Sequence, residues 1–287
     1  MIPSAFDYYA PKTVAEAVAL LREYGEQAKV LAGGQSLLPL LKLRLASPRV
    51  VVDLGRIADL AYIRREGEEV AIGAMTRHEE VERSDVVRQY CRLLAATAAT
   101  IGDVQVRNRG TIGGSLAHAD PAGDFPAAVL ALEGRMKVVG PDGERWIAAE
   151  DFFLDVMTTA LKADEILTEV RVAVDGEGAR SAYEKIRQKA TGFALCGVAV
   201  RLRVDEAKVC QDVAVGVTGV GAKAYRARAV EEALRGKEVT EAAIASAAAE
   251  AVQGVEPNED AQASAAYRAH LARVCTRRAL SRALAGS

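Results

Sequence analysis

Two glycine-rich turns, about eighty residues apart, constrain this chain more than any other feature of its sequence. The first turn reads Ala32-Gly33-Gly34-Gln35-Ser36, and the second reads Thr111-Ile112-Gly113-Gly114-Ser115. Because glycine has no Cβ, successive backbone N–H groups of such a turn can converge on phosphate oxygens, and a serine hydroxyl adds one donor. A single turn of this kind is more often only a tight turn, but two of them favour a diphosphate ligand.

The segments around the first turn alternate between predicted helices and strands. A helix is predicted over residues 13–24, where Thr13 and Glu16 have the spacing of a capping box and Gly25 ends the helix. The apolar run 29–32 predicts a buried strand that leads into the first turn, and residues 37–45 predict the helix after it. Further elements are strands at 50–54 and 70–74, a helix from about residue 77, and a longer helix over 85–99.

The second turn lies in a long glycine-rich passage, residues 101–126, which remains apolar despite five glycines and two prolines. Such a composition is expected where the backbone must approach another group closely. After the turn, Asp120 and Asp124 supply carboxylates that can accept hydrogen bonds from a ribose or an adenine. Alone, the same residues are typical of a turn that caps a helix, with Asp124 near the helix N-terminus. A helix is predicted from residue 127 onward.

The polar segment 175–180 is the clearest linker in the sequence and predicts a domain boundary. Strands are predicted at 136–140, 165–172 and 183–188, and alternating apolar segments at 195–204 and 212–220 predict antiparallel strands. Three alanine-rich stretches then predict helices at 224–235, 240–252 and 263–284. The fold class is therefore α+β. We expect a domain over 1–175, with subdomains of about 1–55 and 56–175, and a C-terminal domain over 179–287 in which antiparallel strands pack with helices.

Charge and hydropathy argue against several classes of protein. The 37 basic and 39 acidic side chains give a net charge of −2, which provides no general attraction for nucleic acid or an anionic membrane. No window reaches the length of a membrane span, and the N-terminus does not resemble a signal peptide, so we expect a cytoplasmic protein. The four cysteines are far apart and predict buried thiols, and the three histidines show no spacing typical of a metal site.

The glycine turns and the segments around them resemble a known family, the FAD-binding medium subunits of the molybdenum hydroxylases. This family includes aerobic carbon monoxide dehydrogenase and bacterial dehydrogenases of N-heterocycles, and a homologous domain occurs in xanthine dehydrogenase. The resemblance extends over nearly the whole chain, through residues 6–21, 32–44, 107–127, 164–172 and 185–200. It implies a two-part FAD-binding domain followed by an α+β flavoprotein domain.

The same resemblance implies which residues surround the FAD. The residues implied around the pyrophosphate are Ala32, Gly33, Gly34, Gln35, Ser36, Thr111, Gly113, Gly114 and Ser115. We also expect Leu37, Ile112, Ala117 and Asp120 in the cofactor site. Asp124 would contact the adenosine side. Backbone at Ile166 and Leu167 and the segment from Lys185 to Phe193 would approach the isoalloxazine, where Phe193 either shields the ring or serves as a core aromatic. Some relatives carry His at the position of Gln35 and Asp or Asn at that of Ser115.

The resemblance also implies a division of labour between subunits. Substrate would be hydroxylated at a molybdenum cofactor in a large subunit, and electrons would pass through iron–sulfur clusters in a small subunit to the FAD of this chain. From there they would leave to an external acceptor. A dimer of heterotrimers is the implied assembly. No residue of this chain would act on the substrate, and no metal ligand is expected in it.

Three other functions have partial support in the sequence. Ser36 and Ser115 each resemble the nucleophile of a serine hydrolase, but the final glycine of G-x-S-x-G is missing from both turns and only His270 follows late in the chain. Residues 219–224 match a loose G-x-G-x-x-A fingerprint, although a second helix is predicted where a Rossmann fold needs a strand. The third alternative is a non-enzymatic subunit that binds a nucleotide or acts only as an assembly scaffold.

Overall fold

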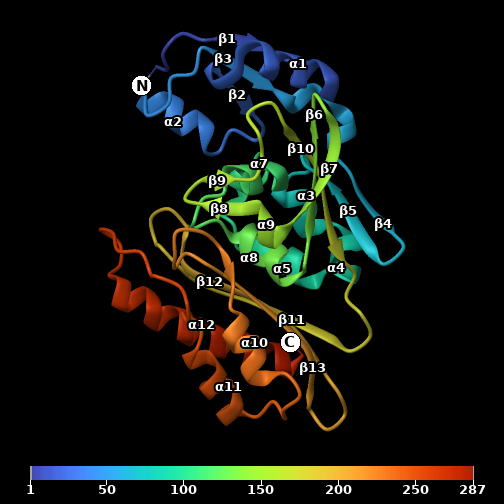
Figure 1. The fold of residues 1–287 in the computed structure, drawn as a ribbon, viewed down its shortest axis with the longest axis vertical. Helices are drawn as coiled ribbons and strands as arrows, with labels where there is room; N and C mark the ends of the chain where they lie inside the picture. The colour runs from blue at the N-terminus through green and yellow to red at the C-terminus, as the bar shows by residue number, and fades with distance from the viewer. Residues whose placement is uncertain (1, 287) are drawn as a thin grey trace.

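The computed structural model describes residues 2–286 of the chain. Figure 1 shows an elongated molecule, with the N-terminal segment at one end, the middle of the chain at the centre and the C-terminal segment at the other end. The buried apolar side chains form three clusters, one in the N-terminal, one in the middle and one in the C-terminal segment. A few members of these clusters come from a neighbouring segment. The predicted α+β class is confirmed. We retain the division into 1–55, 56–175 and 179–287 as a proposal.

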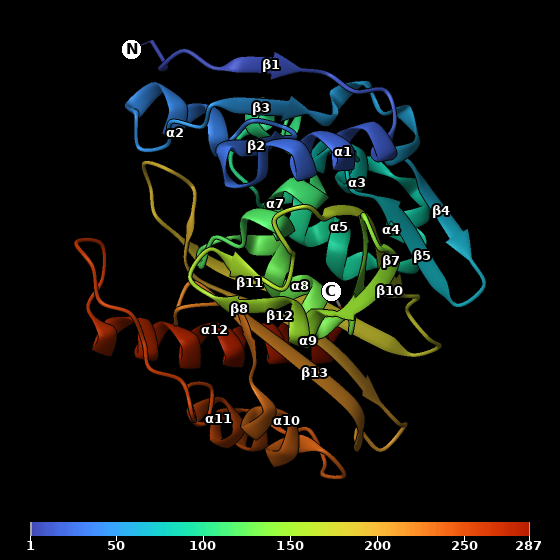
Figure 2. The same cartoon turned by 45° about the horizontal axis from the view of Figure 1, so that its top comes forward.

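The N-terminal segment is a small parallel sheet in the order β1-β3-β2 with helices beside it (Figure 2). Its elements are β1 (Asp7–Tyr9), α1 (Val14–Tyr24), β2 (Ala28–Leu31), α2 (Leu37–Leu43) and β3 (Val50–Asp53). Thr13 caps α1 by accepting a hydrogen bond from the N–H of Glu16 at 3.1 Å, which confirms the predicted start of this helix. The Glu16 carboxylate accepts from the N–H of Lys12 at 2.8 Å, so it does not return the bond to Thr13 as a capping box would.

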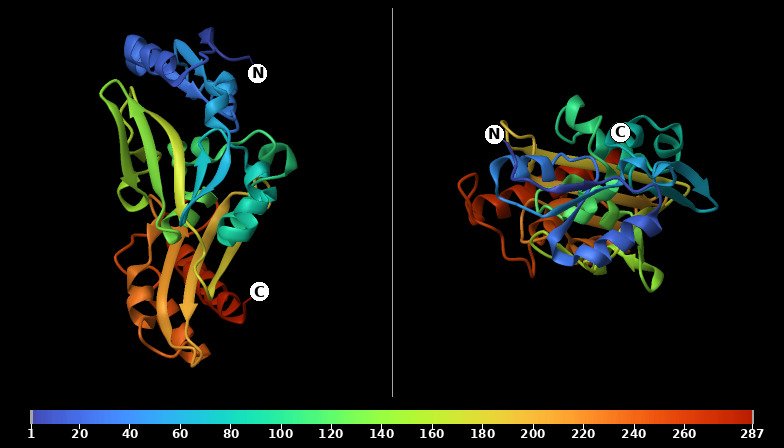
Figure 3. Two further views of the ribbon diagram at one scale, coloured as in Figure 1. Left: turned by 90° about the vertical axis from the view of Figure 1, so that its right-hand side faces the viewer. Right: turned by 90° about the horizontal axis from the view of Figure 1, so that it is seen from above.

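The middle segment is an antiparallel sheet in the order β4-β5-β10-β6-β7. Its strands are β4 (Ile63–Glu66), β5 (Glu69–Gly73), β6 (Arg135–Gly140), β7 (Gly143–Ala148) and β10 (Ile166–Ala173), and a hairpin of β8 (Phe153–Asp155) and β9 (Thr158–Thr159) lies before β10. Its helices are α3 (His78–Arg83), α4 (Asp85–Tyr90), α5 (Arg92–Ala99), α6 (Val104–Arg107), α7 (Ile112–His118), α8 (Asp124–Ala131) and α9 (Ala149–Phe152). Figure 3 shows most of these helices gathered on one side of the sheet.

The predicted long helix over 85–99 is wrong, because the chain bends at Cys91 and forms two helices, α4 and α5. Cys91 has φ −150° and ψ 56°, which is not helical. Its thiol lies 3.2 Å from the carbonyl oxygen of Ala173, and the Asp175 carboxylate accepts a hydrogen bond from the N–H of Arg92 at 3.0 Å. Contacts with the end of β10 therefore break the helix, although its sequence pattern is continuous.

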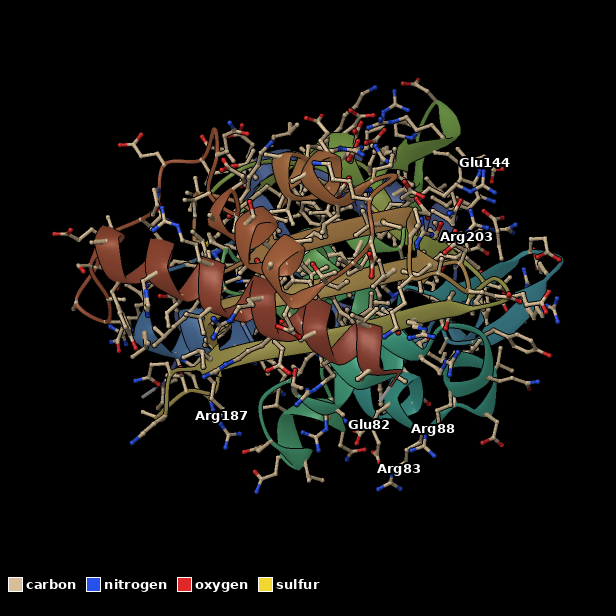
Figure 4. The ribbon with its side chains drawn as sticks, turned by 90° about the horizontal axis from the view of Figure 1, so that it is seen from below. Glu82, Arg83, Arg88, Glu144, Arg187 and Arg203 are labelled. Carbon is tan, nitrogen blue, oxygen red and sulfur yellow. The ribbon has the colours of Figure 1, made fainter. Side chains whose placement is uncertain are left out.

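The C-terminal segment is an antiparallel sheet in the order β11-β12-β13-β14, with α12 lying across β11 and β12 (Figure 4). Its elements are β11 (Ala179–Arg187), β12 (Ala194–Val204), β13 (Cys210–Thr218), β14 (Tyr225–Arg226), α10 (Arg228–Leu234), α11 (Glu241–Ala249) and α12 (Ala265–Ala285). The predicted helix over 224–235 begins later than expected, because Tyr225 and Arg226 pair with β13. All four cysteines are buried and unpaired.

The middle and C-terminal segments share a tightly packed contact between α8 and β13. A Cβ on Gly216 of β13 would lie 2.0 Å from the carbonyl oxygen of Ala127 in α8. Because Cβ atoms do not approach backbone this closely, only glycine allows α8 to rest on the sheet at this position. This contact brings the residues that follow the second glycine turn next to the C-terminal sheet.

Candidate functional site

Both glycine turns line one cavity of about 580 Å³, a volume typical of sites for small molecules and cofactors. Its walls come from the N-terminal segment, from the middle segment and from the loop between β11 and β12. Figures 1 and 2 show α2 and that loop on the same side of the molecule, with α7 nearer its centre. Thirteen of the predicted site residues line it: Ala32, Gly33, Gly34, Gln35, Ser36, Leu37, Thr111, Gly114, Ser115, Ala117, Asp120, Asp124 and Phe193.

The two turns touch each other although they are distant in sequence. A Cβ on Gly33 would lie 2.2 Å from the carbonyl oxygen of Arg109 and 2.6 Å from the Cα of Gly110. A Cβ on Gly114 would lie 3.3 Å from the Cβ of Ala32. Glycine at position 33 therefore permits the first turn to pack directly on the backbone that enters the second.

The first turn presents backbone donors that no other group of the protein uses. Within residues 2–286, the N–H groups of residues 33–37 have no hydrogen-bond acceptor. Gly34 has φ +73°, a conformation that side chains with a Cβ rarely adopt. Ser36 stands before α2 without capping it through its side chain, so its hydroxyl also remains available to a ligand. A row of free donors on a cavity wall is suited to an anion such as a diphosphate.

The second turn uses four of its five backbone N–H groups within the protein, which corrects the expectation that both turns present successive free N–H groups to a ligand. The N–H groups of Ile112 and Gly113 donate to the carbonyl oxygens of Thr76 at 3.0 Å and Ala74 at 2.9 Å. The N–H of Gly114 donates to the Thr111 hydroxyl at 3.1 Å. The N–H of Ser115 donates to the Thr111 carbonyl oxygen at 3.0 Å, and the N–H of Thr111 has no acceptor among residues 2–286. Besides that N–H, this turn offers the cavity the side-chain hydroxyl groups of Thr111 and Ser115.

Ile112 and Gly113 lie behind the cavity wall rather than on it. Ile112 is fully buried in the middle core. A Cβ on Gly113 would lie 2.5 Å from the Cβ of Ala74, so this glycine is needed for packing against β5 and the residues after it. Ile166 and Leu167 are also buried core residues at the start of β10, and the cavity is lined there by Glu165.

Asp124 is a buried carboxylate at the edge of the cavity, and both of its oxygens are hydrogen-bonded within the protein. The Tyr183 hydroxyl donates to Oδ1 at 2.6 Å, and the Lys185 ammonium lies 2.8 Å from Oδ2. Burial raises the pKa of Asp124, and the charge of Lys185 opposes this rise. Lys185 itself lies behind the cavity wall, since it does not line the cavity. The Asp120 carboxylate accepts from the N–H of Ala122 at 2.9 Å, as in a capping turn.

Phe193 is about half exposed at the cavity edge, with a relative accessibility of 47%, so the interpretation as a core aromatic is wrong. It follows Gly192, where a Cβ would lie 3.5 Å from the Cα of Gly102. The loop between β11 and β12 therefore meets the start of the glycine-rich passage. Ile101 and Val106 continue the apolar wall at this end of the cavity.

Several lining residues were not singled out from the sequence. They include His78, Ile101, Gly102, Val106, Lys29 and residues of the segment 157–165, among them Lys162. The composition of residues 101–126 already indicated a close approach of the backbone to another group. Nothing in the local sequence distinguishes His78, which reaches the cavity because α3 begins beside the second turn.

The rival interpretations find no matching geometry. Among the described residues, neither Ser36 nor Ser115 hydrogen-bonds to a histidine, and His270 lies on α12. Residues 219–224 follow an antiparallel strand, and the N–H of Gly219 donates to the carbonyl oxygen of Pro121.

The part of the chain that the structure describes holds no cluster of three or more metal-ligating side chains. None of its helices combines the length and hydropathy that crossing a membrane requires.

Comparison with known proteins assigns the chain to a family. Residues 4–174 match the family described as "FAD binding domain in molybdopterin dehydrogenase", and residues 181–283 match "CO dehydrogenase flavoprotein C-terminal domain". The carbon monoxide dehydrogenase medium chain of Hydrogenophaga pseudoflava is 42% identical, covering 99% of both chains. That of Afipia carboxidovorans is 40% identical over the same shares.

Solved structures agree with the sequence comparison. The carbon monoxide dehydrogenase of Hydrogenophaga pseudoflava that lacks the Mo-pyranopterin moiety of the molybdenum cofactor has a TM-score of 0.97 at 44% identity, covering 99% of each chain. Quinoline 2-oxidoreductase from Pseudomonas putida 86 has a TM-score of 0.93 at 32% identity, covering 100% of this chain and 99% of that one. The chain therefore belongs to the FAD-binding medium subunits of the molybdenum hydroxylases and is a flavoprotein component of an oxidoreductase.

Proposed function

We propose that this chain is the flavin-bearing electron-transfer subunit of a molybdenum-containing hydroxylase. In this proposal a large subunit holds the molybdenum cofactor and a small subunit holds iron–sulfur clusters. Electrons pass from the small subunit to FAD in this chain and then to an external acceptor. The observation that carries the proposal is the row of unpartnered N–H groups at residues 33–37, on the wall of a cavity that both glycine turns share.

The residues of the cavity fit a flavin dinucleotide in two respects. A diphosphate needs several hydrogen-bond donors, and the first turn supplies backbone N–H groups while Thr111 and Ser115 supply hydroxyls from the opposite side. A flat aromatic ring needs apolar walls, and Ile101, Val106 and Phe193 line the end of the cavity beside the loop between β11 and β12. We therefore propose that the isoalloxazine lies at that end and the diphosphate lies between the turns.

In this function the chain binds and orients the cofactor and does not act on the organic substrate. Bound FAD supplies a group that accepts electrons singly and releases them singly or in pairs. The rigid turns would fix the diphosphate, and the buried pair of Asp124 and Lys185 would hold α8 and β11 in place beside the ring. We assign no residue of the chain to substrate chemistry.

We propose further that the chain works in a dimer of heterotrimers. We place this assembly in the cytoplasm, where the four unpaired cysteines would remain reduced. The test is purification of the tagged chain from its native host, followed by analysis of bound flavin, molybdenum and iron. We expect one FAD per chain, together with a large polypeptide that carries molybdenum and a small polypeptide that carries iron.

The alternative of a non-enzymatic scaffold gives a different result in the same experiment. A scaffold would bring down the same two polypeptides without flavin, and the complex would still lack flavin after incubation with FAD and desalting. Purification of the chain without either polypeptide would contradict both functions. Because flavin absorbance and metal content are separate readouts, the loss of one does not obscure the other.

A further inference from the structure

His78 is a buried histidine on the cavity wall whose ring has no hydrogen-bond partner. It is the first residue of α3, is 5% exposed and lines the cavity. Within residues 2–286, neither ring nitrogen makes a hydrogen bond, and Nδ1 is shielded from solvent. Buried polar atoms are nearly always paired, so an unpaired imidazole at the wall of a cofactor cavity requires an explanation.

The ring is held firmly next to the second glycine turn. The N–H of His78 donates to the carbonyl oxygen of Gly110 at 2.9 Å, and its ring meets Phe125 edge-on with 5.1 Å between ring centroids. A Cβ on Gly110 would lie 2.6 Å from Nε2 of His78. The Nε2 edge of the imidazole therefore lies against Gly110, where only a residue without a Cβ leaves room for it.

The position of His78 indicates which part of a dinucleotide it would meet. Gly110 lies next to His78, and an added Cβ on Gly33 of the first turn would come within 2.6 Å of the Gly110 Cα. An added Cβ on Gly110 would also lie 3.1 Å from the carbonyl oxygen of Val106. Ile101 and Val106, which we place beside the isoalloxazine, line the same cavity. His78 thus lies next to Gly110, which is close to residues of both the proposed diphosphate site and the proposed ring site, so we place the ribityl chain of FAD beside it.

The imidazole is neutral at this position. Burial lowers the pKa of His78 to about 4, and the positive charge of Arg107 contributes to the shift. A neutral imidazole has one N–H donor and one acceptor nitrogen, whereas an imidazolium has donors only. A hydroxyl both donates and accepts, so it can pair with Nε2, the ring nitrogen that is not shielded, in either tautomer, while a phosphate can only accept.

We propose that His78 is a contact residue for the bound flavin nucleotide and hydrogen-bonds a hydroxyl of its ribityl chain. This inference rests on the proposed function, because it takes FAD as the ligand of the cavity. A hydrogen bond to the ligand would explain why the ring of His78, which lies against Gly110 on the cavity wall, has no partner within the protein. If His78 served only for packing, FAD affinity would not depend on the hydrogen-bonding capacity of its side chain.

The test compares His78→Leu, which removes the hydrogen-bonding groups, with His78→Gln, which keeps a donor and an acceptor at similar reach. His270→Leu, at an exposed position on α12, is the matched control. FAD-free protein is titrated with FAD by fluorescence quenching and with ADP by competition, and thermal unfolding is followed in parallel. Since the chain has three histidines, ¹⁵N-imidazole NMR with and without FAD reports directly on the ring.

We expect His78→Leu to weaken FAD binding at least tenfold and to change ADP binding less than twofold, because ADP has no ribityl chain. His78→Gln should bind FAD within about threefold of the wild type. The ¹⁵N resonance that is missing in His78→Leu should shift when the wild type binds FAD, and that of His270 should not. Unchanged FAD affinity in both variants, or equal losses for FAD and ADP, would overturn the inference. If the wild type itself binds no FAD, the proposed function fails first.

Discussion

The carboxylate of Asp124 and the ammonium of Lys185 lie 2.8 Å apart, and each side chain is only 5% exposed. Asp124 begins α8 in the middle segment, and Lys185 lies on β11 in the C-terminal segment. The pair therefore links two segments at the edge of the cavity. Tyr183 donates to the second carboxylate oxygen at 2.6 Å, so the buried charge has a partner at each oxygen.

Lys185→Met should strongly destabilise the FAD-free protein at neutral pH. It leaves Asp124 as a buried carboxylate without a compensating cation, and breaking such a pair costs about 3–5 kcal/mol. Burial already raises the pKa of Asp124, and the substitution raises it further. A carboxyl whose folded-state pKa is raised contributes stability at low pH that is lost as the pH rises through that pKa. The difference in the free energy of unfolding between the wild type and Lys185→Met, measured with urea, should therefore grow from pH 4 to pH 8.

The double variant Asp124→Asn with Lys185→Met is the control for this experiment. Because an amide carries no charge, its stability relative to the wild type should recover at pH 8 compared with the single variant. A deficit that is the same at every pH would show that lost packing, and not the charge of Asp124, causes the effect.

Gly34→Val should abolish tight FAD binding while the protein stays folded. Gly34 has φ +73°, and a Cβ there would lie 2.8 Å from Cδ1 of Leu38, so the first turn must shift. We expect the Kd for FAD to rise more than 100-fold. Gly176→Val is the matched control, because Gly176 has no neighbour within 4 Å of an added Cβ and no positive φ. Its affinity should remain within twofold of the wild type. If both substitutions weakened FAD binding equally, the first turn would not be part of the cofactor site.

The buried His78 should make the protein less stable in mild acid. Burial lowers its pKa to about 4, whereas the unfolded chain takes up the proton near 6.5. The stability that this group contributes is therefore present above pH 6.5 and is lost as the pH falls towards 4. At about 1.4 kcal/mol per pH unit, the free energy of unfolding should fall by roughly 3 kcal/mol over this range. Urea unfolding between pH 7 and pH 4 should show this loss in the wild type and a smaller loss in His78→Leu. Parallel curves for the two proteins would exclude His78 as its source.

Phe193→Ala should affect the flavin ring more than the rest of the cofactor. The side chain is half exposed and lines the cavity edge, so its removal leaves no large hole in a core. We expect a thermal unfolding temperature close to that of the wild type and increased accessibility of the bound ring to iodide quenching. ADP affinity should stay the same. An unchanged quenching constant would place the ring elsewhere in the cavity.

The sequence predicted those elements whose pattern is set locally. Residues 13–24 carry both an apolar face and the Thr13 cap, so neither depends on the rest of the fold. The bend at Cys91 was not predictable, because the atoms that stabilise it belong to Ala173 and Asp175, more than eighty residues away. Short elements such as β14 likewise form only because a neighbouring strand pairs with them.

The site was predictable in outline and not in its division of roles. The glycine pairs identified both turns, since few other sequences allow backbone to approach backbone or ligand this closely. They did not reveal that the amides of Ile112 and Gly113 are used by Thr76 and Ala74, because that pairing depends on tertiary structure. The contribution of His78 follows from the same pairing, which sets α3 beside the second turn.

The central claim, that the backbone of the first turn grips the diphosphate of FAD, is tested most directly by amide hydrogen exchange with and without FAD. Residues 33–37 have free N–H groups and should exchange quickly in the FAD-free protein and at least tenfold more slowly with FAD. Residues 112–115 are already hydrogen-bonded within the protein and should change little. Protection by FAD at the second turn, with no change at the first, would contradict the account.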